Sequence, residues 1–249
     1  MSYGIYLSAS GVVSASHRQD VIANNLANVE TAGFKRSLAV FRERRAEDKP
    51  GDGIRGLSGG LLVAPSRLDV TQGALEETNN PLDVALHGAG YLAVQQPDGS
   101  LRLTRDGRTA IDRDGYLVSA SDGVSRVLDT KQRSILIHGF PPSILNVDRA
   151  GRILIKGTSE SLGQIGVFAL PAGAAAIPDG RSRLVVPAAA LPRGDAEVRG
   201  GMVERSNVDP ATEMVRLMEA QRQLDANANL IRFQDEATGR LVGEVGKIG

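Results

Sequence analysis

Apolar, small and amide residues recur at alternating steps of three and four along both ends of the 249-residue chain. This spacing places them on one face of a helix, as in the seam of a coiled coil. The series near the start is Ile5, Ser8, Val12, Ala15, Gln19, Ile22, Leu26 and Val29, and the series toward the end is Met214, Leu217, Gln221, Leu224, Ala228 and Ile231. We therefore predict a helix at each end, and the shared period predicts that the two helices pair.

Capping residues indicate where these helices begin and end. The first helix should stop near Thr31–Gly33, where the glycine is free to take the left-handed conformation. The second should begin at Pro210, behind a cap at Asn207 or Asp209, and continue to about Leu241. A helix of that length spans roughly 45–50 Å and is longer than a typical globular helix.

Between the helices the sequence changes to short β-type runs separated by turn signals. "YLAVQQ" and "SLRLTR" flank a Pro-Asp-Gly turn at residues 97–99, which predicts a hairpin. "RSILIH", "RILIK" and "QIGVFAL" also read as strands, whereas Ala169–Ala176 and Pro187–Pro192 read as loops. Strands at this spacing are typical of a β-barrel or a sandwich-like module.

These patterns predict an α+β fold in which coiled-coil-like terminal helices bracket an inserted all-β domain. The expected parts are an N-terminal helical segment at 1–41, a charged and Gly-rich connector at 42–60, a β-rich outer domain at 61–201 and a C-terminal helix at 202–249. A single pair of narrow-seamed helices buries little surface, and small assemblies of this kind usually need further subunits. We therefore expect other subunits to complete the ends.

Composition excludes several classes of function. The chain has 29 basic and 29 acidic residues, so it lacks the excess of positive charge typical of nucleic-acid binders and polybasic membrane proteins. It has no cysteine, which rules out disulfides and thiolate metal sites. The first 20 residues do not resemble a Sec-type signal peptide, and no apolar run approaches the ~18 residues of a membrane span. Any export would need another route.

One motif suggests an enzyme. Gly56-Leu57-Ser58-Gly59-Gly60 fits G-x-S-x-G, the nucleophile elbow of serine hydrolases. The elbow requires a preceding strand and a following helix, but "KPGDGIR" has no strand character and Pro65 interrupts any helix. A flexible connector is the better interpretation, and a hydrolase using Ser58 is kept only as an alternative.

Metal and phosphate sites are also weakly supported. Asp112-Arg113-Asp114-Gly115 resembles the start of a calcium loop, but Ser121 stands where the loop needs Glu, so a hairpin turn fits better. His17, His87 and His138 are scattered in sequence, which is a poor pattern for a metal site. We expect no catalytic residues, no metal and no cofactor. A β-domain binding module that uses the helices only to oligomerise remains a third class.

Three asparagines, Asn24, Asn25 and Asn28, flank the first seam although asparagine is a weak helix former. Small neutral amides suit a surface that other helices will crowd, because a charge would be costly there and a hydrogen bond can still form. The alternative is that Asn28 frays the helix. Gln221 can likewise set the register across helices or, with Arg222, can simply face solvent.

Four segments, in order, resemble the flagellar axial proteins, which are the rod, hook and hook-associated subunits. They are "DVIANNLANVETAGFKR", "TQGALEETNNPLDVALHGAGYLAV", "LTRDGRTAIDRDGYLV" and "GGMVERSNVDPATEMVRLMEAQRQLDANANLI". The chain resembles rod proteins more than the longer hook protein in its length, in its short connector and in the segment Asn80-Pro81-Leu82-Asp83. The chain departs from the family at Tyr91-Leu92, Leu103-Thr104-Arg105 and Leu224, where aromatic residues are usual.

The resemblance implies a non-enzymatic subunit of the flagellar basal-body rod, of the proximal or the distal type, with the proximal type favoured. It implies export through the flagellar type III apparatus, a periplasmic location and partners that are copies of itself and neighbouring axial subunits, with no nucleic acid and no membrane insertion. Terminal helices would form an inner tube and order on assembly, and the β-domain would face outward. The expected assembly interface is Ile22, Asn24, Asn25, Leu26, Asn28, Val29, Phe34, Lys35, Asn207, Met214, Leu217, Gln221, Arg222, Leu224, Asn227 and Ile231.

Overall fold

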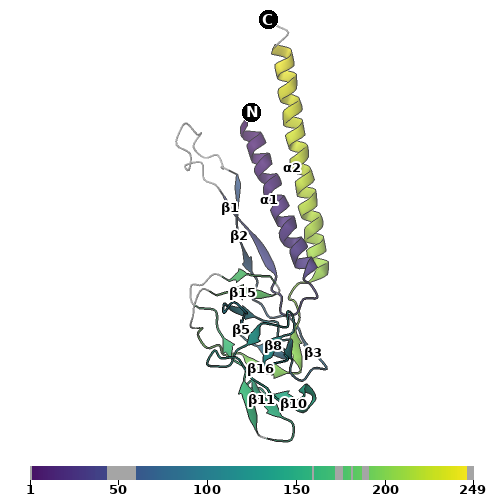
Figure 1. Ribbon diagram of the computed structural model, residues 1–249. Coiled ribbons are helices and arrows are strands. Elements are labelled where there is room, and N and C mark those ends of the chain that lie inside the picture. The colour runs from purple at the N-terminus through teal and green to yellow at the C-terminus, as the bar shows by residue number, and fades with distance from the viewer. Residues whose placement is uncertain are drawn as a thin grey trace. The chain divides into compact units, whose positions relative to one another are not determined.

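A computed structural model describes residues 2–43, 60–158, 160–171, 176–180, 182–186 and 191–245. Helix α1 (Ser2–Ala27) and helix α2 (Pro210–Val245) stand at the two ends of the described chain, and the strands lie between them in sequence (Figure 1). The α+β prediction is therefore confirmed. No helix of the described residues is long and apolar enough to cross a membrane.

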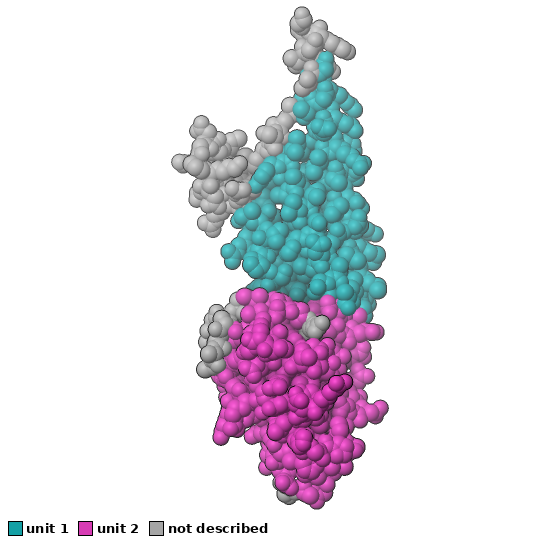
Figure 2. Space-filling view, viewed as in Figure 1, with its two compact units in different colours: residues 1–27, 37–69, 209–249 teal, residues 28–36, 70–208 magenta. Residues whose placement is uncertain are grey.

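The chain divides into two compact units, which Figure 2 colours separately. Unit 1 contains Met1–Ala27, Ser37–Asp69 and Asp209–Gly249, and unit 2 contains Asn28–Arg36 and Val70–Val208. The chain therefore passes between the units after residues 27, 36, 69 and 208. The short loop at 28–36 belongs to unit 2 although both of its neighbours in sequence belong to unit 1.

In unit 1 the two helices lie side by side and antiparallel (Figure 1). Arg18 donates to Gln223 at 3.1 Å and Gln19 donates to Gln221 at 2.5 Å. Nearer the start of α1, a Cβ on Gly11 would lie 2.8 Å from the Asn227 side chain. The two helices therefore contact each other in unit 1 through polar side chains and a glycine, and their coiled-coil pairing stays a prediction.

Unit 1 also contains an antiparallel hairpin of β1 (Ser37–Glu43) and β2 (Leu61–Leu68). Arg42 and Glu43 were predicted to lie in the connector, but they continue β1 because they pair with Leu62 and Leu61. The outer β-domain was predicted to begin at Leu61. In the structure β2 belongs to unit 1 together with the helices, because it pairs with β1. The rest of the predicted connector, residues 44–59, lies outside the described residues.

Unit 2 contains the remaining strands, which form several antiparallel sheets. The strands are β3 (Leu75–Glu77), β4 (Val84–His87), β5 (Tyr91–Gln95), β6 (Leu101–Thr104), β7 (Thr109–Ile111), β8 (Leu117–Ser119), β9 (Arg126–Val127), β10 (Leu145–Val147), β11 (Arg152–Ile155), β12 (Ser161–Gln164), β13 (Val167–Phe168), β14 (Ile177–Pro178), β15 (Arg183–Val185), β16 (Glu197–Gly200) and β17 (Met202–Glu204), with a 3-10 helix η2 (Pro142–Ile144) before β10.

The largest sheet has the order β14-β15-β6-β5-β9-β8-β7, and β13 pairs with β5. Three smaller sheets are β10-β11-β12, β16-β4 and β17-β3. The large sheet does not return to its first strand among the described residues, so the described strands do not close it into a barrel. The sandwich-like module stays a prediction.

The core of unit 2 is built from aliphatic residues, as expected for a chain without Trp and with few aromatics. Its buried members are Leu82, Val84, Leu86, Leu92, Val94, Leu117, Val127, Ile135, Ile137, Leu145, Ile153, Ile165 and Val198. "RSILIH" was predicted to be a strand, but Ser134 and Leu136 form only isolated bridges. Ile135 and Ile137 nevertheless point into the core, which is why the run is apolar.

Three hairpin turns of unit 2 are each held by an aspartate side chain in the same way. The carboxylates of Asp112, Asp129 and Asp148 each accept hydrogen bonds from the backbone N–H groups two and four residues later. A left-handed residue follows three positions after each aspartate, at Gly115, Gln132 and Gly151. The hairpin interpretation of Asp112–Gly115 is therefore confirmed, because the turn itself uses one oxygen of Asp112.

The helix ends are confirmed in part. Asp209 caps α2, because its carboxylate accepts from the N–H groups of Ala211 and Thr212. Helix α1 ends at Ala27, earlier than predicted. Gly33 does have a left-handed backbone, with φ of 65°, but the reason is different. A Cβ there would lie 2.2 Å from the backbone N of Asp106, so the loop at 28–36 needs glycine for close packing.

An ion pair between Asp122 and Arg183 yields a prediction for unit 2. Their side chains are 2.6 Å apart and almost fully buried. Burial raises the pKa of Asp122, but hydrogen bonds from Ser125 and Arg183 outweigh that effect and lower the pKa to about 2. The folded state thus holds the proton less tightly than the unfolded state, and the resulting stability is present above about pH 4 and lost toward about pH 2.

We expect Asp122→Asn to lower the free energy of unfolding by about 1–2 kcal/mol at neutral pH. The difference from the parent should shrink as the pH falls toward about 2. Chemical unfolding of the full chain across this pH range measures it, with Asp114→Asn at an exposed turn position as the control. A difference that does not change with pH would contradict the assignment.

Candidate assembly interface

Helix α2 has large apolar side chains that the described part of the chain leaves exposed. Among its described side chains only Glu213 and Ala220 are buried. Phe233 is 67% exposed and Met218 is 57% exposed. The large apolar residues of α2 that are exposed are Met214, Val215, Met218, Leu230, Phe233 and Leu241. At 3.6 residues per turn, most of this set lies on the side of α2 opposite to Leu217, Ala220 and Leu224. We call these six residues the apolar face.

The end of α2 extends past the start of α1. The antiparallel register places Gly4 against Gln234, because a Cβ on Gly4 would lie 2.9 Å from the Gln234 amide nitrogen. Helix α1 begins at Ser2, so α2 continues for roughly 14 Å beyond it. A Cβ added at Gly239 or Gly243 would meet no atom within 4 Å. The described residues of unit 1 therefore leave this end of α2 uncovered.

The predicted interface residues of α2 fall into two groups. Met214 and Arg222 are exposed, and Met214 belongs to the apolar face. Leu217, Leu224, Asn227 and Ile231 are half-buried and lie on the side that carries Gln221. The prediction that Gln221 bonds across the helices is confirmed, because Gln19 Nε2 donates to Gln221 Oε1.

The predicted residues of α1 also divide. Ile22 is buried within the subunit, Leu26 is half-buried and Asn24 is exposed. Asn28 follows the end of α1, where Thr31 donates to its backbone and side-chain oxygens. Asn28 therefore belongs to the turn that ends the helix, as the alternative interpretation held. Val29 is half-buried in the same turn.

Asn25 corrects the expectation that all three asparagines face other subunits. Its side chain is 1% exposed and is used inside unit 1. The amide donates to Ser37 O at 2.9 Å and accepts from Ser37 N–H at 2.8 Å. It also donates to the buried carboxylate of Glu213 at 3.1 Å, which in turn accepts from Arg216. Asn25 thus joins the end of α1, the start of β1 and the first turn of α2.

Lys35 is a second correction. It is buried in unit 2, where its ammonium donates to Glu204 and to Thr71 O at 2.6 Å each. Phe34 and Asn207 are half-buried in the same unit, and the Asn207 backbone N–H donates to Phe34 O at 3.4 Å. A buried cation is an internal contact of the subunit, so Lys35 is not available as an exposed assembly residue.

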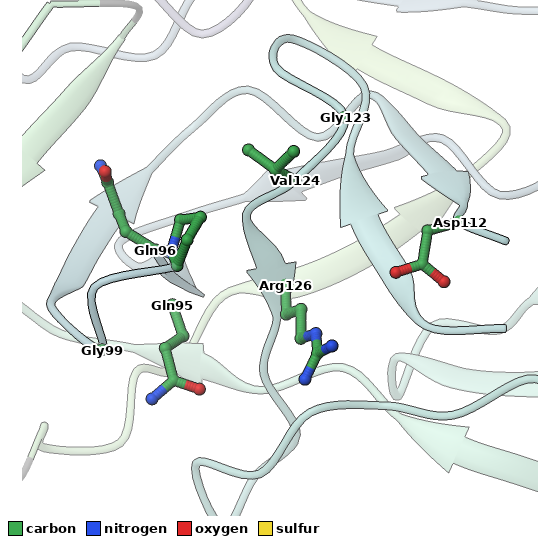
Figure 3. A pocket seen from close by; sticks show the side chains of 8 residues that line it. Gln95, Gln96, Gly99, Asp112, Gly123, Val124 and Arg126 are labelled. Carbon is green, nitrogen blue, oxygen red and sulfur yellow. The ribbon is translucent and has the colours of Figure 1, made fainter. Parts of the chain in front are cut away.

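Unit 2 carries a hollow of about 490 Å³ among its turns, shown in Figure 3. It is lined by Gln95, Gln96, Pro97, Gly99, Asp112, Gly123, Val124 and Arg126. The Arg126 guanidinium stacks on the Tyr116 ring at 3.9 Å, and Asp112 holds its own turn. The lining therefore contains no acid–base pair or nucleophile poised for reaction.

The described residues give no support to the alternative of a catalytic serine or a metal site. Ser58 lies outside the described residues. His17 belongs to unit 1 and packs edge-on against Phe41, whereas His87 and His138 belong to unit 2. In the part of the chain that the structure describes, no three His, Cys, Asp or Glu side chains form a group that could hold a metal ion.

Sequence reasoning missed several important residues. Met218 and Phe233 could have been found by projecting α2 onto a helical wheel and reading the side opposite to the seam. Glu204 and Glu213 could not, because a single glutamate in a polar stretch gives no sign that it will be buried. Their roles depend on residues far away in sequence.

The double hydrogen bond of Asn25 to Ser37 requires a group that both donates and accepts. Asn25→Asp removes the donor and places a second carboxylate beside Glu213. We expect it to lower the free energy of unfolding of the helical unit by about 3 kcal/mol at neutral pH, because two carboxylates would be buried side by side. Circular dichroism during chemical unfolding measures the effect.

Asn229→Asp makes the same chemical change at an exposed position of α2 and serves as the control. It should shift the free energy of unfolding by less than about 0.5 kcal/mol. Equal effects of the two substitutions would show that Asn25 has no special position.

Comparisons with known proteins agree with this arrangement. Residues 5–35 match the family model for flagella basal body rod proteins, residues 85–153 match the D1 domain of flagellar hook protein FlgE/F/G, and residues 199–243 match the C-terminal part of flagellar basal body rod FlgEFG proteins. The first and third matches cover most of α1 and α2.

Relatives match over nearly the whole length. The chain is 30% identical to flagellar basal-body rod protein FlgG of Buchnera aphidicola, with 95% of this chain and 97% of that one covered. It is 30% identical to FlgF of Caulobacter vibrioides, with both chains covered completely, and 30% identical to FlgG of Bacillus subtilis, with 97% and 98% covered. The chain therefore belongs to the flagellar basal-body rod proteins and is a structural subunit of the rod.

Proposed function

We propose that this subunit polymerises through α1 and α2 into the axial tube that crosses the periplasm and transmits motor torque. The observation that carries the proposal is the apolar face of α2. Six large apolar side chains that remain 46–67% exposed cost free energy in water. They form two groups, at 214–218 and at 230–241, and grouped exposed apolar residues can mark an interaction site. Copies of the same subunit and neighbouring axial subunits are the proposed occupants.

The energetics favour assembly over a stable isolated helix pair. Burying the exposed half of one such side chain stabilises an interface by roughly 1 kcal/mol, so the apolar face contributes several kcal/mol per subunit. The contacts between α1 and α2 include polar ones, such as Gln19 with Gln221, which contribute less. Unit 2 has its own aliphatic core. We therefore propose that the helices form the inner tube and that unit 2 faces outward.

Export and position in the rod complete the proposal. We propose that the chain is exported through the flagellar type III apparatus, acts without catalysing a reaction and occupies the proximal rod. The chain length and the short connector between the predicted helical segment and the β-domain support the proximal position. A distal position is the alternative, and relatives named FlgG and FlgF match the chain equally well. Locating the subunit by labelling it in isolated basal bodies distinguishes the two.

Phe233→Glu tests the apolar face. The side chain is exposed in the subunit, so the variant should fold with unchanged helix content and unfolding midpoint. It should nevertheless abolish motility, because a charge would have to be buried when the helices assemble. Swimming assays, with recovery of the subunit in basal bodies, measure the outcome.

Ile177→Glu is the matched control, since Ile177 is an exposed apolar residue of unit 2 at 54% exposure. Cells that carry it should swim normally. Full motility of the Phe233→Glu strain would contradict assembly through this face of α2.

A further inference from the structure

A fully buried carboxylate lies in unit 2 with two cations. Glu204 is 0% exposed. Its carboxylate accepts from Lys35 Nζ at 2.6 Å and from Arg105 at 3.0 Å, and both cations are themselves buried. The N–H of Gly73 also donates to the carboxylate at 3.0 Å. We call Lys35, Arg105 and Glu204 the charge clamp.

The excess positive charge of the clamp is compensated by backbone oxygens and a ring. Lys35 also donates to Thr71 O, and Arg105 donates to Gly88 O at 2.6 Å. The Arg105 guanidinium lies 5.2 Å from the centre of the Tyr91 ring. Removing Glu204 would leave two buried cations, which is strongly unfavourable. Removing Lys35 would leave a one-to-one pair of Arg105 and Glu204, which the fold can tolerate.

The charge clamp holds the loop at 28–36, which contains Lys35. The Gly33 N–H donates to the Glu204 backbone oxygen at 2.7 Å. Asn207 adds a second tie, because its Oδ1 accepts from Arg36 N–H at 2.7 Å and its Nδ2 donates to Thr71 O at 3.1 Å. The loop is therefore held by one buried charge cluster and one amide bridge.

These contacts coincide with the places where the chain leaves unit 2. The chain passes to unit 1 after residues 36 and 208 and returns after residues 27 and 69. Lys35 and Asn207 stand next to two of these points, Thr71 stands next to the third, and the loop at 28–36 begins at the fourth. The connections after residues 36, 69 and 208 are thus tied together inside unit 2, and the connection after residue 27 leads into the same loop at 28–36.

We infer that the charge clamp is a mechanical joint: it makes the four connections leave unit 2 as one rigid base, so that load applied to the helices reaches the β-domain without local opening. This role rests on the proposed function, because only a rotating rod applies such load. A purely structural role would stabilise unit 2 as a whole. A joint protects the connections specifically.

Lys35→Met separates these roles. On the purified full chain, we expect amide hydrogen exchange at Gly33 and Gly73 to become at least tenfold faster, with unchanged exchange in the paired strands β10 and β11. Asn207→Ala, which removes the amide bridge and leaves the charges in place, should show the same local pattern and keeps the test open if Lys35→Met does not fold. Uniform acceleration across unit 2 in the folded variant would overturn the joint.

In cells, we expect the Lys35→Met subunit to reach basal bodies at normal abundance. When the medium is made viscous, the swimming speed of the Lys35→Met strain should fall by a factor at least twice as large as that of the parent strain. Arg133→Met is the matched control, because Arg133 is an exposed cation of unit 2 that pairs with Asp129. Equal swimming of the two variants would overturn the joint.

A deletion of Met1–Thr31 distinguishes failure of the joint from failure of the proposed function. If the deletion strain swims, the proposed rod function itself is wrong. If the deletion abolishes motility and Lys35→Met behaves as Arg133→Met does, only the joint is wrong.

Discussion

Helix α2 spans 36 residues, yet only Glu213 and Ala220 are buried among its described side chains. A helix of this length gains little stability from propensity alone and depends on packing of an apolar face. Helix α1 supplies only part of that packing, and the Gln19–Gln221 hydrogen bond is one of its contacts. The apolar face stays exposed in the subunit, and we propose that other subunits cover it.

Two buried polar clusters compensate for the weak helical pair inside the subunit. In unit 1 the Asn25 amide joins α1, β1 and the first turn of α2 through Ser37 and Glu213. In unit 2 the Glu204 carboxylate holds the loop at 28–36 through Lys35. Both clusters depend on directional hydrogen bonds, which specify one arrangement, whereas the assembly surface is apolar and less directional. The subunit thus separates internal specificity from association.

The sequence predicted the elements with local signals and missed those with distant causes. The helical period together with Asp209 and Pro210 predicted where α2 lies. The turns that contain Asp predicted the hairpins of unit 2. Asn25 and Lys35 were assigned to the surface because their partners, Glu213 and Glu204, are 188 and 169 residues away in the chain. The placement of β2 was missed for a similar reason: pairing with β1, and not composition, decides its unit. The apolar face could have been predicted from the sequence, but the prediction followed the seam residues on the other side of α2.

The central claim is that the apolar face of α2 contacts another axial subunit in the flagellum. A photoreactive amino acid at Met218, in cells with complete basal bodies, measures this most directly. The account predicts a covalent adduct between two axial subunits in purified basal bodies and no adduct in the purified monomer. Absence of any adduct between subunits in intact basal bodies, with the photoreactive subunit incorporated at normal abundance, would contradict it.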